Sequence, residues 1–393
     1  MNPQDSDVSR FARTKFRGSG TLFGIKQADR LLHMYVIGQT GVGKSTLLEV
    51  LARRDMDAGR GFALIDPHGD LVERVHATVP DHLRDKVTYL NAPDATQPFG
   101  YNPLRRVRED KIPLAASGIL ETFRKLWPDA WGVRMEHVLR NSLYALLERE
   151  GSTLPDILEM YADEKFRKRV VRGIRNDVVR TFWRDEFENY PARLRAEAVM
   201  PIQNKLGALL SDPLLFRILV APLVDVRFRT IMDEGRILLV NLSKGRIGED
   251  AAHILGGLIV STLGLAAFTR ADAASTSRRP FFLYVDEFQS FTTLAFVNML
   301  SELRKFGVGL TLAHQFTRQL EPEILHAVLG NVGTLISFRV GAEDAGMLAT
   351  EFQPVFDRED LVNLPNRDFY LKLMIDGTPS RPFSARTITP GEG

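Results

Sequence analysis

The chain has 393 residues, of which 44% are hydrophobic, and its 51 Lys and Arg nearly balance its 49 Asp and Glu. It contains no cysteine, which excludes disulfides, zinc–thiolate sites and cysteine nucleophiles and fits a reducing compartment. The net charge of +2 gives no ground for nucleic-acid binding by the chain as a whole, so such binding would need local basic patches or an assembly. The length allows about two to three domains.

The N-terminal residues 1–22 are polar and of mixed charge, and they lack the apolar segment of a signal peptide. We expect them to form a loosely ordered arm, or an arm that contacts another subunit, outside the main domain. With no leader and no cysteine, the chain is expected to be cytoplasmic.

A phosphate-binding loop is predicted at residues 38–45. The apolar run 34–37 predicts a buried strand before it, and a helix is expected from Thr46 to about Asp57. Between them, GQTGVGKS matches the loop pattern without a mismatch. Its glycines permit a close backbone approach, and its N–H groups and the helix N-terminus attract phosphate. The predicted nucleotide-binding residues are Gly38, Gln39, Thr40, Gly41, Val42, Gly43, Lys44, Ser45 and Thr46.

Two side chains of this loop have specific expected roles. Lys44 should reach the β- and γ-phosphates of ATP, which makes it a catalytic candidate, and the Ser45 hydroxyl should hold Mg²⁺. The alternative is a chance glycine-rich turn, which the flanking strand and helix disfavour.

The spacing of apolar residues divides the rest of the chain into a helical segment and an α/β domain. From residue 103 to 222 the apolar residues recur at helical spacing, which predicts an inserted all-helical domain. The flanking segments 23–102 and 223–393 are expected to form one discontinuous α/β domain with a mostly parallel central sheet. A turn at residues 67–70 lies where such sheets bind ligands. The predicted strands are 62–66, 86–90, 236–242, 281–285, 309–313 and 334–338, with 369–375 as an edge strand.

Two other segments leave alternatives open. Residues 251–268 are nearly long enough to span a membrane, but a histidine, three glycines and a Ser-Thr pair favour a helix buried between the sheet and a neighbour. A basic run lies in the helical segment, and it is either a solvated face, a site for an acidic subunit surface, or a contact to a phosphate backbone. Its members are Lys165, Arg167, Lys168, Arg169, Arg172, Arg175 and Arg180.

The catalytic candidates follow predicted strand ends. Asp286 and Glu287 come directly after strand 281–285; Asp286 suits the Mg²⁺ shell, and Glu287 suits polarisation of the attacking water. Gln315 follows strand 309–313 and is expected to orient water or γ-phosphate, or else to be an ordinary strand-end polar residue.

Cations are candidates for other roles. Arg304 closes a predicted helix and is either an arginine finger for a neighbouring subunit or ordinary matching of the helix dipole, and Arg339 is a second finger candidate. Lys244 and Arg246 are candidates for lining a DNA channel, or else belong to a solvated turn.

These motifs together resemble the HerA/FtsK superfamily of DNA-pumping ATPases, and within it the HerA-like and type IV secretion coupling-protein ATPases. The DPHGD turn and the VDEFQ…LRKFG…AHQ spacing are more specific than the phosphate loop alone. The resembling stretches are FGIKQADRLLHMYVIGQTGVGKSTLL, GFALIDPHGDL, YNPL, ILLVNLSKGRIGED, FFLYVDEFQSF, ELRKFGVGLTLAHQ and NVGTLISFRV.

The resemblance implies a RecA-like P-loop NTPase that assembles as a hexameric ring, with ATP and Mg²⁺ between subunits and double-stranded DNA in the channel. It implies that Lys44 and Ser45 bind nucleotide and magnesium, that Asp286 and Glu287 form the acidic pair, that Gln315 is the sensor and that Arg304 is a finger acting in trans. It also implies that the helical segment caps the mouth of the ring.

The chain departs from the family pattern in two ways, and two other functions remain as alternatives. The usual N-terminal transmembrane helices of coupling proteins and the usual β-barrel of HerA proteins are not predicted here. We therefore expect a bare motor whose nuclease or membrane anchor is a separate partner, which could place it at the inner membrane. The alternatives are a nucleotide-gated scaffold of a secretion, defence or nuclease complex, and a subunit for conjugative coupling.

Overall fold

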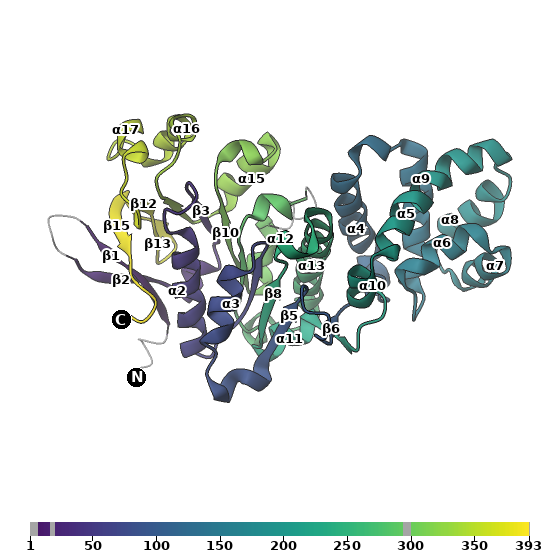
Figure 1. Cartoon of the computed structure of the whole chain (residues 1–393), viewed down its shortest axis with the longest axis horizontal. Helices are drawn as coiled ribbons and strands as arrows, with labels where there is room; N and C mark the ends of the chain where they lie inside the picture. The colour runs from purple at the N-terminus through teal and green to yellow at the C-terminus, as the bar shows by residue number, and fades with distance from the viewer. Residues whose placement is uncertain (1–6, 16–19, 294–299, 393) are drawn as a thin grey trace.

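The computed structural model describes residues 7–15, 20–293 and 300–392. Within these residues an 11-stranded sheet forms the centre, in the order β2-β1-β15-β12-β11-β3-β10-β9-β4-β8-β5 (Figure 1). Its strands are β1 (Val8–Thr14), β2 (Leu22–Lys26), β3 (Met34–Ile37), β4 (Gly61–Asp66), β5 (Val87–Asn91), β8 (Ile237–Asn241), β9 (Phe281–Val285), β10 (Val308–His314), β11 (Thr334–Ser337), β12 (Asp368–Lys372) and β15 (Phe383–Thr387).

Helices connect the strands, and several of them cover the two faces of the sheet. Those whose bounds the structure gives are α1 (Gln27–Arg30), α2 (Lys44–Asp57), α3 (Asp70–Ala77), α4 (Ile112–Leu126), α5 (Val133–Glu148), α6 (Leu154–Ala162), α7 (Glu164–Gly173), α8 (Asp177–Thr181), α9 (Ala192–Ser211), α10 (Pro213–Leu219), α11 (Phe228–Glu234), α12 (Lys244–Ile247), α13 (Glu249–Thr269), α15 (Pro322–Asn331), α16 (Ala342–Phe352) and α17 (Arg358–Val362). Short strand pairs join β6 (Phe99–Gly100) to β7 (Val224–Asp225) and β13 (Met374–Ile375) to β14 (Thr378–Pro379).

The sheet is mostly parallel. Each neighbouring pair from β11 through β3, β10, β9, β4 and β8 to β5 is parallel. The strands β12, β15, β1 and β2 pair antiparallel on the other side of β11. Parallel neighbours need crossover connections, which is why helices cover both faces. The predicted α/β class with a mostly parallel central sheet is therefore confirmed.

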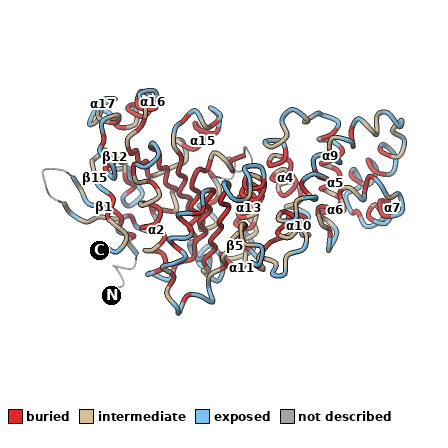
Figure 2. Tube along the Cα trace, in the orientation of Figure 1, coloured by how far each residue is buried: buried red, intermediate tan, exposed pale blue. Residues whose placement is uncertain are grey.

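Both faces of the central strands are buried, as Figure 2 shows. On one face, Tyr35, Ile65 and Leu283 belong to a core that includes α13 and extends into the helices α4 to α10. On the other face, Val36 and Phe282 pack with the apolar sides of α2 and α3. Because side chains alternate along a strand, continuous apolar runs are needed when both faces are covered. This is why the sequence marks these strands so clearly.

The helices α4 to α10, which we call the helical region, lie at the opposite end of the molecule from β1 and β2 (Figure 1). Its first helix, α4, packs against α13 of the sheet part. Small residues permit this approach: a Cβ added at Gly118 would lie 3.1 Å from Ser261 Cβ, and one at Gly257 would lie 2.9 Å from the Thr122 methyl group. The core beneath α4 and α13 is continuous with that of the sheet.

The apolar segment 251–268 forms most of α13. In the described part of the chain it belongs to the one helix that is long and apolar enough to cross a membrane, and 72% of that apolar window is buried. It packs between the sheet and α4, with α11 beside it. The predicted buried helix is therefore confirmed, since its hydrophobic surface is already covered by protein.

Two expectations about the sheet are wrong. Residues 8–14, expected in an arm, form β1 inside the sheet, while residues 1–6 and 16–19 of that arm lie outside the described residues. Charged outward residues and a register shift between Arg10 and Ala12 hide the alternation of β1. The predicted edge strand at 369–375 is also wrong, because β12 lies between β11 and β15. A turn at residues 376–377 closes the β13–β14 hairpin.

Candidate active site

Four parallel strands bring their carboxyl ends to one edge of the sheet. In the register, Ile37 of β3 is paired with His314 of β10, and Val285 of β9 is paired with Leu312 of β10 and with Ile65 of β4. The segments that follow these strand ends therefore lie side by side, as ligand-binding segments do in open α/β sheets. They carry the phosphate loop after β3, Asp66 at the end of β4, the pair Asp286–Glu287 after β9 and Gln315 after β10.

The phosphate loop adopts a conformation that depends on its glycines. Gly41 and Gly43 have φ angles of 78° and 119°, a region that residues with a Cβ rarely adopt. A Cβ on Gly38 would lie 2.6 Å from the Phe338 Cβ, so β11 and the loop approach too closely for a side chain. Helix α2 begins at Lys44, and its N-terminus faces the loop. This is the local geometry that binds phosphate through backbone N–H groups.

Lys44 lies across its own loop. Its ammonium donates hydrogen bonds to the carbonyl oxygens of Gly38 at 2.6 Å and Gln39 at 3.0 Å. Burial lowers the pKa of Lys44, and the carboxylates of Asp286 and Glu287 oppose that shift. The structure therefore brings the lysine, the loop and the acidic pair together. Exchanging carbonyl oxygens for phosphate oxygens would keep the ammonium hydrogen-bonded.

Ser45 and Asp286 contact each other beside the phosphate loop. The Ser45 Oγ donates to Asp286 Oδ2 at 3.5 Å, and Asp286 is only 5% exposed. Burial, Asp66 and Glu287 raise the pKa of Asp286 to about 7, while Lys44 acts in the opposite direction. A divalent cation beside this carboxylate would relieve that unfavourable charge.

The donor set fits Mg²⁺ in particular. Among the residues that the structure describes, no group of three or more His, Cys, Asp or Glu side chains is arranged to hold a metal. Ser45 and Asp286 thus supply too few ligands for a cation cage made by protein alone. Mg²⁺ commonly uses one or two protein oxygens and completes its shell with phosphate oxygens and water. The site fits a metal that arrives with a nucleotide.

Glu287 is held in an unusual conformation. Its φ is 47° and its ψ is 47°, which is left-handed and uncommon for a residue with a side chain. Two amides fix its carboxylate: Gln289 Nε2 donates to Oε2 at 2.6 Å, and Gln315 Nε2 donates to Oε1 at 2.8 Å. Its backbone N–H donates to Asp286 Oδ1 at 3.0 Å. Such constrained residues cluster at functional sites, because the surroundings must hold them.

Sequence reasoning missed two members of this cluster. Asp66 is buried, and its Oδ2 accepts N–H bonds from Leu71 at 2.9 Å and Val72 at 3.1 Å, so it caps α3 beside the acidic pair. Its position at the end of a predicted strand was an available signal. Gln289 lies within the quoted VDEFQ motif, but its contact with Glu287 depends on the conformation of the turn η8 (Phe288–Ser290).

A comparison with protein families matches residues 27–261, more than half of the chain, to the family described as the central domain of helicase HerA. The chain belongs to this HerA family. A comparison with curated proteins finds no match.

Solved structures share the fold of this HerA-family chain. The bacterial conjugative coupling protein TrwB, in its unbound form, is 17% identical with a TM-score of 0.67, over 93% of this chain and 86% of that chain. TrwB in complex with ADP and Mg²⁺ is 16% identical with a TM-score of 0.68, over 98% and 96%. VirB4 of Thermoanaerobacter pseudethanolicus is 16% identical with a TM-score of 0.61, over 97% and 96%. The sheet part is therefore a RecA-like P-loop ATPase fold.

The two finger candidates of this HerA-family chain lie at opposite edges of the sheet. Arg304 is exposed in η9 (Arg304–Phe306), before β10, whereas Gln315 follows the end of that strand. Seven residues of β10 span about 20 Å, so Arg304 is far from the phosphate loop of its own chain. Any contact between Arg304 and a phosphate would have to involve another subunit.

Arg339 instead lies beside its own phosphate loop. Its Nε donates to Gln39 Oε1 at 3.3 Å, its Nη1 to the Leu364 carbonyl at 3.1 Å and its Nη2 to Asn366 Oδ1 at 3.0 Å. The backbone N–H of Gln39 also donates to the Arg339 carbonyl at 2.9 Å. These contacts connect the loop to the segment before β12 within one chain.

The predicted DNA-contact residues divide between two places. Lys244 and Arg246 lie on α12, at the same sheet edge as the phosphate loop, and the Lys244 N–H donates to the Pro67 carbonyl at 2.7 Å. In the helical region, the basic run lies on and after α7. Arg167 is buried there and pairs with Glu188 at 2.7 Å, so it stabilises the fold. Four other members of the run, Lys165, Lys168, Arg169 and Arg172, lie on α7 and are all exposed.

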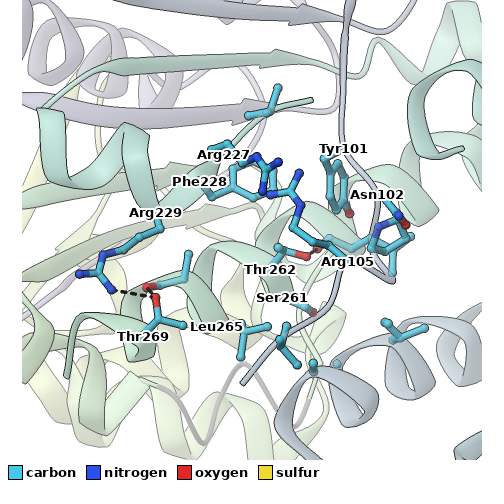
Figure 3. Close-up of a pocket in the computed structure, with 18 of the residues that line it drawn as sticks. Tyr101, Asn102, Arg105, Arg227, Phe228, Arg229, Ser261, Thr262, Leu265 and Thr269 are labelled. Carbon is cyan, nitrogen blue, oxygen red and sulfur yellow. Dashed lines mark hydrogen bonds between the residues drawn. The ribbon is translucent and has the colours of Figure 1, made fainter. Parts of the chain in front are cut away.

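A concave region lies between the sheet part and the helical region (Figure 3). It has a volume of about 320 Å³ and lies among α4, α11 and the C-terminal half of α13. Figure 3 shows Tyr101, Arg105, Phe228 and Ser261 around it, and it includes none of the phosphate-loop or acidic-pair residues. The nucleotide chemistry therefore belongs to the sheet edge and not to this cavity.

Proposed function

We propose that this chain is an Mg²⁺-dependent ATPase subunit that assembles as a hexameric ring and translocates double-stranded DNA. The observation that carries the proposal is the arrangement around Glu287. Its carboxylate is held by Gln289 and Gln315, and it lies next to an acidic neighbour that contacts the loop serine. That is the placement a base for ATP hydrolysis needs. The TrwB structure with ADP and Mg²⁺, which has the same fold, supports ATP and Mg²⁺ as the ligands.

Each residue of the site has a part in hydrolysis. Lys44 binds the β- and γ-phosphates, and the loop N–H groups orient them. Ser45 and Asp286 would hold Mg²⁺, which would supply positive charge against the charge on the phosphates. Glu287 accepts a proton from the attacking water as the water oxygen bonds to the γ-phosphorus and the bond to ADP breaks. Gln315 keeps the carboxylate in position and senses the γ-phosphate.

The ring is supported by the position of Arg304. An exposed arginine at the edge opposite the phosphate loop can meet a nucleotide only in a neighbouring subunit. A ring also explains how a chain with a net charge of +2 binds DNA, because six copies of a few basic residues line one channel. Lys244 and Arg246 are the candidates for that lining.

A coupling subunit is the second candidate. The fold likeness to TrwB, which is a conjugative coupling protein, and to VirB4 favours a role in which ATP drives transfer or controls assembly of a secretion or conjugation complex. In that role we propose that the chain acts with a membrane-anchored partner.

The deciding experiment measures ATP hydrolysis with and without linear duplex DNA, while the mass in solution is recorded. A hexamer stimulated severalfold by DNA supports the motor; a monomer, or a ring whose hydrolysis ignores DNA, contradicts it and favours the scaffold or coupling subunit.

Replacing the proposed base tests the site directly. We expect Glu287→Gln to lower kcat by about 100-fold or more, since general-base catalysis contributes that much, while nucleotide binding persists. Glu150→Gln is the matched control, because Glu150 is exposed in the helical region. An unchanged rate for Glu287→Gln would show that another group is the base.

A further inference from the structure

The first helix of the helical region contacts the segment that follows the acidic pair. Lys125 lies at the end of α4, and its ammonium donates to the Gln289 carbonyl at 2.5 Å and to the Thr292 carbonyl at 2.9 Å. The Gln289 carbonyl belongs to η8, the turn that starts directly after Glu287, and the Thr292 carbonyl follows that turn. A side chain 164 positions away in the sequence from Gln289 thus holds this turn from outside.

Gln289 contacts both Lys125 and Glu287. Its main-chain oxygen accepts from Lys125, and its side-chain Nε2 donates to Glu287 Oε2 at 2.6 Å. The distance between the backbone and the amide of one residue is fixed by its rotamer. A shift of the Gln289 backbone therefore moves the amide that fixes the Glu287 carboxylate. The other amide on Glu287, from Gln315, comes from a different strand end and is independent of Lys125.

The environment of Lys125 favours a specific contact over a loose surface charge. The residue is exposed as a whole, but protein surrounds its ammonium, and this burial lowers the pKa of Lys125 to about 8, with Glu321 opposing the shift. The contact lies beside a cavity lined by Glu121, Arg124, Thr292, Thr293, Glu321 and Ile324. A desolvated ammonium with two carbonyl partners keeps its position better than a solvated one.

We propose that Lys125 is a positioning residue for ATP hydrolysis, which holds Glu287 in place through Gln289 and so makes the helical region part of the hydrolysis site. The inference rests on the proposed function of Glu287. It implies that any movement of α4 relative to η8 changes the rate of hydrolysis. DNA or a partner that engages the helical region would act on the site along this path.

The first test is steady-state kinetics of the full chain. We expect Lys125→Met to lower kcat for ATP about tenfold, because displacement of a catalytic group by about 1 Å has effects of this order or larger, while KM for ATP changes less than twofold. Lys125→Arg should restore most of the rate. Arg124→Gln is the matched control: it removes the neighbouring exposed cation beside the same cavity and should leave kcat unchanged.

A double-mutant cycle separates positioning from general weakening of the fold. If Lys125 acts through Gln289, then Lys125→Met should have little further effect in a Gln289→Ala background. Independent, multiplying losses in the two variants would overturn the proposal, as would an unchanged kcat in Lys125→Met.

Amide hydrogen exchange tests the same contact without using activity. The N–H groups of Ser290, Phe291 and Thr292 donate to carbonyls of Glu287 and Phe288 inside this turn. Lys125→Met should speed their exchange severalfold, and Arg124→Gln should not. If the wild-type chain hydrolyses no ATP, the proposed function fails, while the exchange result still decides whether Lys125 orders the turn. Equal exchange in wild type and Lys125→Met would refute the positioning role.

Discussion

Two buried charged clusters lie at opposite ends of helix α2, and they differ in how their charges are balanced. At one end, Lys44 of α2 meets Asp286, which follows β9. At the other end, Asp55 of α2 meets Arg30 and Tyr284 of β9. The first cluster is rich in carboxylates and the second in guanidinium groups. Only the second pairs its carboxylate with hydrogen-bonded guanidinium groups.

The details of the second cluster show what a structural ion pair needs. Arg30 binds Asp55 through two parallel hydrogen bonds of 2.7 and 2.9 Å, and Tyr284 OH donates to the same carboxylate at 2.5 Å. Arg60 adds a third donor group at 3.1 Å, and the Arg30 guanidinium lies 3.6 Å from the centre of the Phe282 ring. Every partner is buried and fixed. This cluster ties α1, α2 and β9 together.

The active-site cluster lacks that compensation. Asp286 has one hydroxyl and one backbone N–H as donors, and two further carboxyl groups, Asp66 and Glu287, lie nearby. The comparison teaches that the negative charge around Asp286 is left for a cation to neutralise. In the structural cluster, arginines neutralise the carboxylate, and this pairing stabilises the fold. Changes to the two clusters should therefore have opposite effects on folding.

The largest expected effect is on the structural cluster. Asp55→Ala leaves two arginines buried without their carboxylate, and breaking such a pair costs about 3–5 kcal/mol of unfolding free energy. Urea or thermal unfolding measures it. Asp57→Ala is the control, because Asp57 is exposed and its pair with Arg54 is 3.7 Å long, so about 0.5 kcal/mol or less is expected. Equal effects of the two substitutions would show that the cluster is not structural.

Replacing the active-site carboxylate of Asp286 is expected to raise the free energy of unfolding, whereas replacing Asp55 lowers it. A pKa of about 7 in the folded state means that folding favours the protonated form of Asp286, so its contribution to stability falls as pH rises from about 4 to about 7. Asp286→Asn removes that charge. We expect the variant to be more stable than wild type at pH 8, by up to about 4 kcal/mol at roughly 1.4 kcal/mol per pKa unit, and to differ little at pH 4.

Unfolding curves between pH 4 and pH 8 measure this effect, and ATP with Mg²⁺ should stabilise the wild type far more than Asp286→Asn. A variant that is less stable than wild type at pH 8 would mean that Asp286 is paired like Asp55. The comparison between the two clusters would then be lost.

The smallest expected effect concerns one contact within the site. Gln315→Ala removes one of the two amides on Glu287 and leaves the Gln289 contact in place. We expect kcat for ATP to fall about tenfold, because the base is less well oriented but still present. Gln203→Ala on the exposed side of α9 is the control. A loss as large as that of Glu287→Gln would mean that Gln315 has a role of its own at the phosphate.

Local patterns in the sequence determined the phosphate loop, the acidic pair, the position of Gln315 and most strands of the parallel sheet. Each of these is a signal within a short window. A glycine pattern marks the backbone conformation of the loop, and a buried strand covered on both faces must be continuously apolar. The half-polar strands β1 and β15 have no such signal, which is why they were missed and β12 was expected at an edge.

The tertiary structure alone decided which groups touch. The amides that hold Glu287, the place of Asp66 beside Asp286, the contact of Lys125 with the turn η8 and the separation of Arg304 from its own loop all depend on strand order and helix packing. Their partners lie up to hundreds of positions apart in the chain, as in the 254 positions between Arg30 and Tyr284. A short sequence window records what each residue can do, but charge balance and orientation are properties of neighbours that only the folded chain brings together.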